Sequence, residues 1–331
     1  MISCKTINRE RSDKPLASIS LDLDNLWSYM KIHGDSGWES FPSYLDTLLP
    51  IVLEVLDNLN LKITFFIVGQ DAALEQNRDV LKMITEQSHE VGNHSFHHEV
   101  WLNTFSKKNI RKELLRAEEH IYCATGQKPV GFRGPGFVWS TELLEVLADS
   151  NYLYDASLLP TFIGPLARMY YFWKSDLNAE EKAQRGKIYS SFRDGLRPIK
   201  PYYWEMEKGS KILEIPVTTV PVLKTPFHLS YLIYLNRLSE YLMILYLKLA
   251  IILCRKTGTS PSFLLHPLDF IGGDEVKGLD FFPGMDLRRD RKIDIFKSTI
   301  RNLRKAFSLT NMSTHAQSIV DSNLTRMQLP G

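Results

Sequence analysis

The order of apolar and polar segments predicts an α/β fold, built either as a (β/α) barrel or as a doubly wound sheet. Short apolar runs rich in β-branched and aromatic residues alternate with segments whose apolar residues recur at helical spacing, over most of the 331 residues. Polar and charged side chains follow several of these runs directly. Parallel strands joined by helices produce this pattern, and function in such folds gathers at the carboxyl ends of the strands.

The N-terminal half supplies four predicted strands. The first, residues 16–24, reads LASISLDLD and carries its acids at the end. The second, KITFFIVG, is a β-branched and aromatic run that ends at Gly69. The other elements expected here are a helix over 41–61, a helix near 80–87, a strand over 89–94, a helix over 107–125 and a strand over 130–136.

The C-terminal half continues the alternation. A helix over 140–150 is capped by Ser140 or Thr141. Further predicted elements are strands at 152–157, 212–222 and 262–270, and a long apolar helix at about 229–256.

Two regions depart from this rhythm. The aromatic and basic stretch from Pro160 to about 213 is expected to be an insertion over the mouth of the barrel. The tail at 311–331 has little periodicity and is expected to be frayed. Residues 1–310 are therefore expected to form a single catalytic domain.

Composition excludes several classes of protein. With 44% apolar and 24% charged residues the chain lies in the globular range, and a net charge of +2 gives no field for gathering phosphates, so we expect no nucleic-acid partner. Three cysteines without CxxC spacing argue against a disulfide framework. The polar N-terminus shows no signal peptide, so a cytoplasmic location is expected.

Polar residues at the predicted strand ends define one candidate site. Because the carboxyl ends of parallel strands meet at one edge, we expect these side chains to share a pocket. The residues are Asp22, Asp24, His94, Arg133, Asp155 and His266.

The segment HSFHH contains a candidate pair of metal ligands. His94 and His98 are four residues apart, so on a helical turn both rings would point to one side. Two neutral imidazoles and one carboxylate leave an open position on a divalent metal such as zinc, and Asp24 could be the third ligand. His97 could replace His98 if the local backbone is not helical, and two structural histidines remain an alternative.

The two acids of the first strand need a cation. Asp22 and Asp24 point to the same side of an extended strand and would repel each other. A metal held by Asp24 would relieve this repulsion and leave Asp22 free as a base. A strand exit that caps the next helix is the alternative.

The sequence resembles the polysaccharide deacetylase family, also called the NodB-homology carbohydrate esterases, in its Asp-x-Asp form. The motifs that carry the likeness are SLDLD, HSFHH, RGPGF and LLHPLDF, with TFFIVG and HEVGNH matching two strands. The likeness runs from about Leu16 to Phe270, with 160–213 poorly covered. It implies a distorted (β/α) barrel and a metal-dependent hydrolase.

The resemblance also implies a role for each matched residue. Asp22 would be the general base, and Arg133 would pair with it and orient it. The metal ligands would be Asp24, His94 and His98, with zinc as the expected ion. His266 would be the general acid.

The sequence departs from the family pattern at one place. The family's Asp-Trp motif, whose acid tunes the catalytic histidine, is not visible. Asp155 is the candidate replacement, although it could equally form a turn or pair with Arg133. Asp269 in HPLDF is the rival.

The apolar helix at 229–256 is interrupted by Arg237, Glu240 and Lys248. A membrane-spanning helix needs about 20 largely uncharged residues, so this helix is not expected to cross a bilayer. Its broad apolar surface is expected either to pack within the protein or to touch the membrane interface peripherally, on the cytoplasmic face.

The function expected from these features is removal of an N-acyl group, in particular an acetyl group, from an amino sugar. The substrate would belong to envelope polysaccharide or glycolipid synthesis, with a lipid-linked sugar as one form. A deformylase or allantoinase-like amidohydrolase of the same fold, and a catalytically silent carbohydrate-binding relative, are the alternatives.

Overall fold

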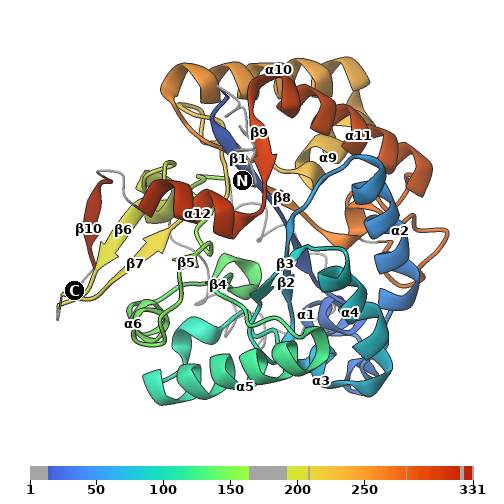
Figure 1. Cartoon of the computed structure of the whole chain (residues 1–331). Coiled ribbons are helices and arrows are strands. Elements are labelled where there is room, and N and C mark those ends of the chain that lie inside the picture. Colours follow the sequence, from blue (N-terminus) through green and yellow to red (C-terminus); the bar gives the residue numbers. More distant parts are fainter. Residues whose placement is uncertain (1–13, 164–191, 208, 281, 321–323, 330–331) are drawn as a thin grey trace, which may run out of the picture.

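The protein folds around one parallel-rich sheet with helices outside it (Figure 1). The computed structural model describes residues 14–163, 192–207, 209–280, 282–320 and 324–329. The strands are β1 Leu16–Leu23, β2 Thr64–Ile67, β3 Glu90–Asn93, β4 Gly131–Phe132, β5 Tyr154–Asp155, β6 Tyr202–Glu205, β7 Lys211–Glu214, β8 Ser262–Leu265, β9 Ser308–Thr310 and β10 Arg326–Gln328. The helices are α1 Leu26–His33, α2 Leu45–Asn58, α3 Gly69–Ala73, α4 Arg78–Glu86, α5 Lys107–Thr125, α6 Thr141–Asp149, α9 Leu229–Leu238, α10 Glu240–Thr257, α11 Arg289–Ala306 and α12 Met312–Val320.

The strand order confirms the predicted α/β fold. Within the described residues the order is β10-β6-β7-β5-β4-β3-β2-β1-β8, with β9 also paired to β1. The pairs are parallel except β6 with β7, which is antiparallel. The segment after β7 reaches β8 through a hydrogen bond from Thr218 N to Ser262 O of 3.0 Å.

Strand β1 is buried on both faces, which places its end at the centre of the fold. Ile19, Leu21 and Leu23 pack in the main apolar core. The alternate residues Ser18 and Ser20 are also fully buried. The register pairs Leu21 with Phe65 of β2 and with Leu265 of β8, so the residues that follow these strands emerge side by side.

The predicted insertion is partly wrong. Residues 164–191 lie outside the described part of the chain. Its last third, however, contributes β6 and β7 to the sheet, where Tyr202, Trp204 and Leu213 are buried. The segment PYYW has the aromatic content of a strand.

The predicted long apolar helix is two helices. The chain becomes extended at Ser239, with φ −167° and ψ 128°, which ends α9 and begins α10. The Ser239 side chain accepts a hydrogen bond from Leu242 N and so caps α10. A serine within an apolar run was the sequence signal for this break.

The expectation of a frayed tail is wrong for most of its described residues. Helix α12 packs on β1, and β10 pairs with β6. Met312, His315 and Ala316 are fully buried. His315 Nδ1 lies 2.9 Å from the Ser18 hydroxyl, so the tail also supplies a polar partner to the central strand.

We predict that α12 contributes to global stability. Met312→Ala removes a fully buried side chain and should lower the free energy of unfolding by about 2–5 kcal/mol. The matched control Gln317→Ala lies on the exposed side of the same helix and should change it by about 0.5 kcal/mol or less. Equal denaturant midpoints for Met312→Ala and the parent would show that the tail is frayed.

Candidate active site and metal centre

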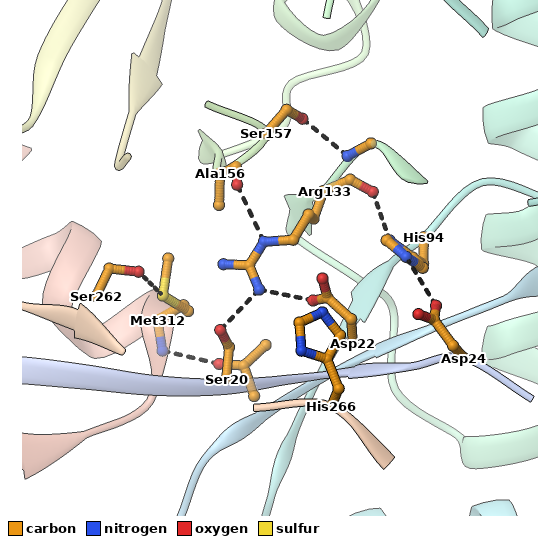
Figure 2. A network of polar contacts seen from close by, with 12 residues as sticks. Ser20, Asp22, Asp24, His94, Arg133, Ala156, Ser157, Ser262, His266 and Met312 are labelled. Atoms are coloured by element: carbon orange, nitrogen blue, oxygen red, sulfur yellow. Dashed lines mark hydrogen bonds and ion pairs between the residues drawn. The ribbon is translucent and has the colours of Figure 1, made fainter. Parts of the chain in front are cut away.

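The two acids at the end of β1 have different partners (Figure 2). Asp22 accepts a hydrogen bond from Arg133 Nη1, at 2.6 Å, in a buried ion pair. Asp24 faces the histidines, with its Oδ1 3.3 Å from His94 Nε2 and 2.9 Å from His98 Nε2. The sequence predicted that both acids lie on one side of the strand. In the structure Asp22 contacts Arg133, whereas Asp24 contacts the two histidines.

The histidine pair meets at Asp24 without the helical turn that the spacing suggested. Residues 94–98 form a loop after β3, in which Ser95 and His98 have positive φ values of 59° and 53°. This bent backbone brings the two rings to within 5.1 Å between centroids. The predicted convergence is correct, but a strained loop produces it.

Glu113 of α5 holds this loop in place. Its Oε1 accepts hydrogen bonds from Phe96 N, at 3.1 Å, and from His97 N, at 2.6 Å. Its Oε2 lies 2.9 Å from His97 Nδ1. His97 is therefore directed toward α5 and away from Asp24, which removes it as the alternative ligand.

The donor atoms fit a divalent metal. Asp24 Oδ1, His94 Nε2 and His98 Nε2 lie within 4.8 Å of one another and are almost fully buried. His94 Nδ1 lies 2.7 Å from the backbone oxygen of Arg133, so Nδ1 carries the proton and Nε2 offers a lone pair. His98 Nε2 and Asp24 Oδ1 are buried without a conventional hydrogen bond. A cation at this point would satisfy all three donors.

The charges of the cluster agree with this donor set. Burial alone would raise the pKa of Asp24, but His98 and His94 lower it well below its usual range. Burial lowers the pKa of His98, against the opposing charge of Asp24. Burial would also lower the pKa of His94, but its contact with Asp24 and the charge of Asp22 raise it. An anionic carboxylate beside a neutral imidazole is the form in which both act as ligands.

Residues after β1 build the wall around Asp24. Asn25 caps α1 by accepting from Leu26 N at 2.8 Å, and its amide donates to Asp71 Oδ1 at 2.7 Å. The same Asp71 oxygen accepts from Trp27 Nε1 at 2.9 Å. The Trp27 ring in turn meets His98 edge-on, with 6.5 Å between centroids. The sequence analysis did not identify this support, because Asp71 is 46 residues away from Asn25.

Arg133 is fixed from several directions. Its Nε donates to the Ala156 backbone oxygen at 3.0 Å, and Nη1 also donates to the Ser20 hydroxyl at 2.8 Å (Figure 2). The guanidinium lies 4.3 Å from the centre of the Phe66 ring. The next residue must be glycine, because a Cβ at Gly134 would lie 2.1 Å from the Val138 oxygen. Arg133 therefore presents a rigid positive charge to Asp22.

Asp155 does not tune His266 in the described contacts. Its Oδ1 accepts from Ser157 Oγ at 2.5 Å, and Ser157 in turn accepts from Gly134 N at 2.8 Å. Burial raises the pKa of Asp155 to about 6, and burial together with Asp155 raises the pKa of Glu214 well above its usual range. The described contacts of Asp155 thus connect it to the Arg133 loop. Its role as a catalytic tuning acid stays a prediction.

The partners of His266 come from the next turn and from α9. Asp269 Oδ2 accepts from His266 N at 2.8 Å, and His266 Nδ1 lies 3.0 Å from the Ser230 hydroxyl. Burial raises the pKa of Asp269, while His266 and a hydrogen bond from Ser230 oppose this. The rival candidate Asp269 therefore contacts His266 through the His266 backbone nitrogen, while Ser230 contacts the His266 ring. Ser230 lies in an apolar helical pattern that gave no sequence signal of this role.

Comparisons with known proteins agree with this site. The family model described as polysaccharide deacetylase matches residues 34–154, a range that contains His94, His98 and Arg133. The peptidoglycan deacetylase of Helicobacter pylori is 27% identical over 151 residues, which cover 44% of this chain and 50% of that protein. The peptidoglycan-N-acetylmuramic acid deacetylase PdaA of Bacillus subtilis is 33% identical over 103 residues, which cover 31% and 38%. The matched segments thus span half or less of these relatives.

A solved structure extends the likeness to the whole fold. A putative polysaccharide deacetylase from Mycobacterium smegmatis superposes with a TM-score of 0.62 at 19% identity, covering 97% of this chain and 96% of that one. Residues 34–154 are thus similar to the polysaccharide deacetylase family, and the whole chain shares the fold of this solved structure. The resemblance drawn from its four motifs is confirmed, although the Asp-x-Asp subgroup stays a prediction.

We predict that the purified protein holds a divalent cation through these three residues. His98→Ala should lower bound metal after dialysis from about one equivalent to near zero, because two donors alone bind a divalent ion weakly. His97→Ala is the matched control, since its ring faces Glu113, and it should retain metal. Elemental analysis by mass spectrometry provides the measurement. Equal loss of metal in the two variants would contradict the assignment.

Proposed function

We propose that the chain is a metal-dependent hydrolase that removes an N-acyl group, in particular N-acetyl, from an amino sugar. The observation that carries this proposal is the cluster of Asp24, His94 and His98. Figure 2 shows Asp24 and His94 of this cluster near the Asp22–Arg133 pair and the His266 ring. The register between β1 and β8 supports it, because Leu21 pairs with Leu265 and Asp22 therefore lies opposite His266. A ligand group, a base and an acid thus lie at the ends of adjacent strands.

The chain's own residues divide the proton transfers between them. A divalent metal bound by the cluster would lower the pKa of a water molecule to about 7. Asp22, which accepts a hydrogen bond from Arg133, would take a proton from the attacking water. His266 is placed to give a proton to the departing amine nitrogen, which would otherwise leave as an unstable anion.

The substrate class is proposed from the relatives. Their names specify acetylated sugars of peptidoglycan or chitooligosaccharides. We therefore propose an N-acetylated amino sugar of an envelope polysaccharide or glycolipid, with a lipid-linked sugar as a further candidate. The alternative of a silent carbohydrate-binding relative has less support, because each ligand, base and acid position is filled by a competent residue.

The proposal is tested by measuring acetate release from a panel of peptidoglycan, chitooligosaccharides and lipid-linked N-acetylhexosamines. We expect release from at least one substrate, loss of activity with a chelator, and recovery when zinc is added back. Protein that holds a full equivalent of metal but releases no acyl group from any member would overturn the proposal.

We predict that Asp22→Asn separates metal binding from turnover. The amide keeps the shape but cannot accept a proton, so kcat should fall about 10²–10⁴-fold. Bound metal should stay at the parent level, because Asp24 and the histidines are unchanged. Turnover equal to that of the parent would remove Asp22 as the base.

We also predict that Ser230 positions His266. Ser230→Ala removes the hydroxyl that lies 3.0 Å from His266 Nδ1, so kcat/KM should fall about 10–100-fold. Ser230→Thr keeps the hydroxyl and should recover most of the activity. Equal losses in the two variants would show a packing role instead.

A further inference from the structure

Helices α9 and α10 expose several large apolar side chains to the outside of the molecule. Tyr241 is 76% exposed, Leu245 52% and Ile252 49%. These residues are spaced at helical intervals and so form one stripe along α10. The α9–α10 apolar face consists of Tyr234, Leu238, Tyr241, Leu242, Leu245, Leu249 and Ile252.

The opposite side of α10 is already used by the core. Met243, Leu247, Ala250 and Cys254 are buried there. A surface helix of this kind normally places polar residues on its outer side, whereas α10 is apolar on both sides. Exposed apolar patches of this extent mark interaction surfaces. Figure 1 shows α10 along the outer edge of the molecule.

The loop before α9 also exposes apolar side chains. Val222 is 83% exposed and Leu223 is also exposed. The loop is attached to α10 through Tyr246, whose hydroxyl lies 2.8 Å from Thr225 Oγ1 and donates to the Pro226 oxygen at 2.7 Å.

The charges around the face are positive. Glu240, the acid of α10, is paired with Arg291 at 2.7 Å. Lys248, Arg255 and Lys256 make no ion pair with any described residue. Lys248 and Arg255 are seven residues apart and so lie on one edge of the stripe, where long side chains can reach past an apolar layer to phosphate groups.

The dimensions exclude a spanning segment and suit an interfacial one. Within the described chain, no helix has the length and apolar character needed to cross a bilayer. The stripe from Tyr241 to Ile252 is about 16 Å long at 1.5 Å per residue. An apolar stripe edged by basic residues is the pattern of a helix that lies in the plane of a membrane surface.

We infer that the α9–α10 apolar face binds the surface of an anionic phospholipid bilayer, with α10 lying in the interfacial plane. The stripe enters the boundary between headgroups and acyl chains, and Lys248, Arg255 and Lys256 contact the lipid phosphates. The inference concerns binding alone and stands apart from the proposed hydrolysis. It specifies which residues would make the peripheral membrane contact expected from the sequence.

Flotation of the full chain with vesicles tests the inference. We expect co-flotation with vesicles of 70% phosphatidylcholine and 30% phosphatidylglycerol, and much weaker flotation with phosphatidylcholine alone. Leu245→Glu/Leu249→Glu should reduce the bound fraction about tenfold or more, because it places two charges in the stripe that would enter the bilayer. Leu115→Glu on α5, an equally exposed leucine on another helix, is the matched control and should bind like the parent.

A second pair of variants tests the charge contribution. Lys248→Gln/Arg255→Gln should lower binding to the anionic vesicles about tenfold or more, because it removes two positive charges that attract the anionic surface, whereas the α5 control Lys108→Gln/Lys112→Gln should not. Melting temperature and metal content confirm that each variant is folded. These measurements do not depend on catalytic activity, so failure of the binding inference and failure of the proposed function can be told apart.

Three results would overturn the inference. The parent could remain unbound with both kinds of vesicle, or Leu245→Glu/Leu249→Glu could float like the parent. Light scattering after gel filtration could also show a parent dimer that the same variant converts to a monomer, without vesicle binding by either. That result would mean that a second copy of the chain covers the face.

Discussion

Two carboxylates at the end of one buried strand are the constraint on which the rest of the site depends. Asp22 and Asp24 are almost fully buried on the same side of β1, and both can stay ionised only beside separate positive partners. Arg133 provides that partner for Asp22. Asp24 faces two imidazoles whose geometry suits a shared cation. In the proposed function, one residue would thus separate a proton acceptor, Asp22, from a metal ligand, Asp24.

The surrounding structure works to keep these partners in place. The Arg133 guanidinium is fixed by the Ala156 oxygen and Ser20, while its backbone oxygen orients His94. One residue thus links the base to the metal centre. Asp155 and Glu214 support the loop behind it, and Glu113 holds the histidine loop. Each support comes from a different element, so the site forms only when the sheet is assembled.

The sequence predicted the elements that carry strong local patterns. The parallel strands, α5 and the convergence of Asp24, His94 and His98 follow from periodicity and from residues at strand ends. The helical turn at His94 and the single helix at 229–256 were wrong, because backbone strain at Ser95 and an extended Ser239 override local propensity. The contact of Ser230 with His266 and the contacts that connect Asp155 to the Arg133 loop were not predictable, because these partners are distant in sequence. The order of the C-terminal tail was not predicted, because its short apolar pattern is stabilised by packing of α12 on β1, which is distant in sequence.

The most direct test of the central claim is a crystal structure of the metal-loaded protein with anomalous scattering at the metal edge. The account predicts one ion about 2.0–2.2 Å from Asp24 Oδ1, His94 Nε2 and His98 Nε2, with Asp22 outside the coordination sphere and still bound to Arg133. An ion ligated by Asp22, or by the Nδ1 atom of His94, would contradict it.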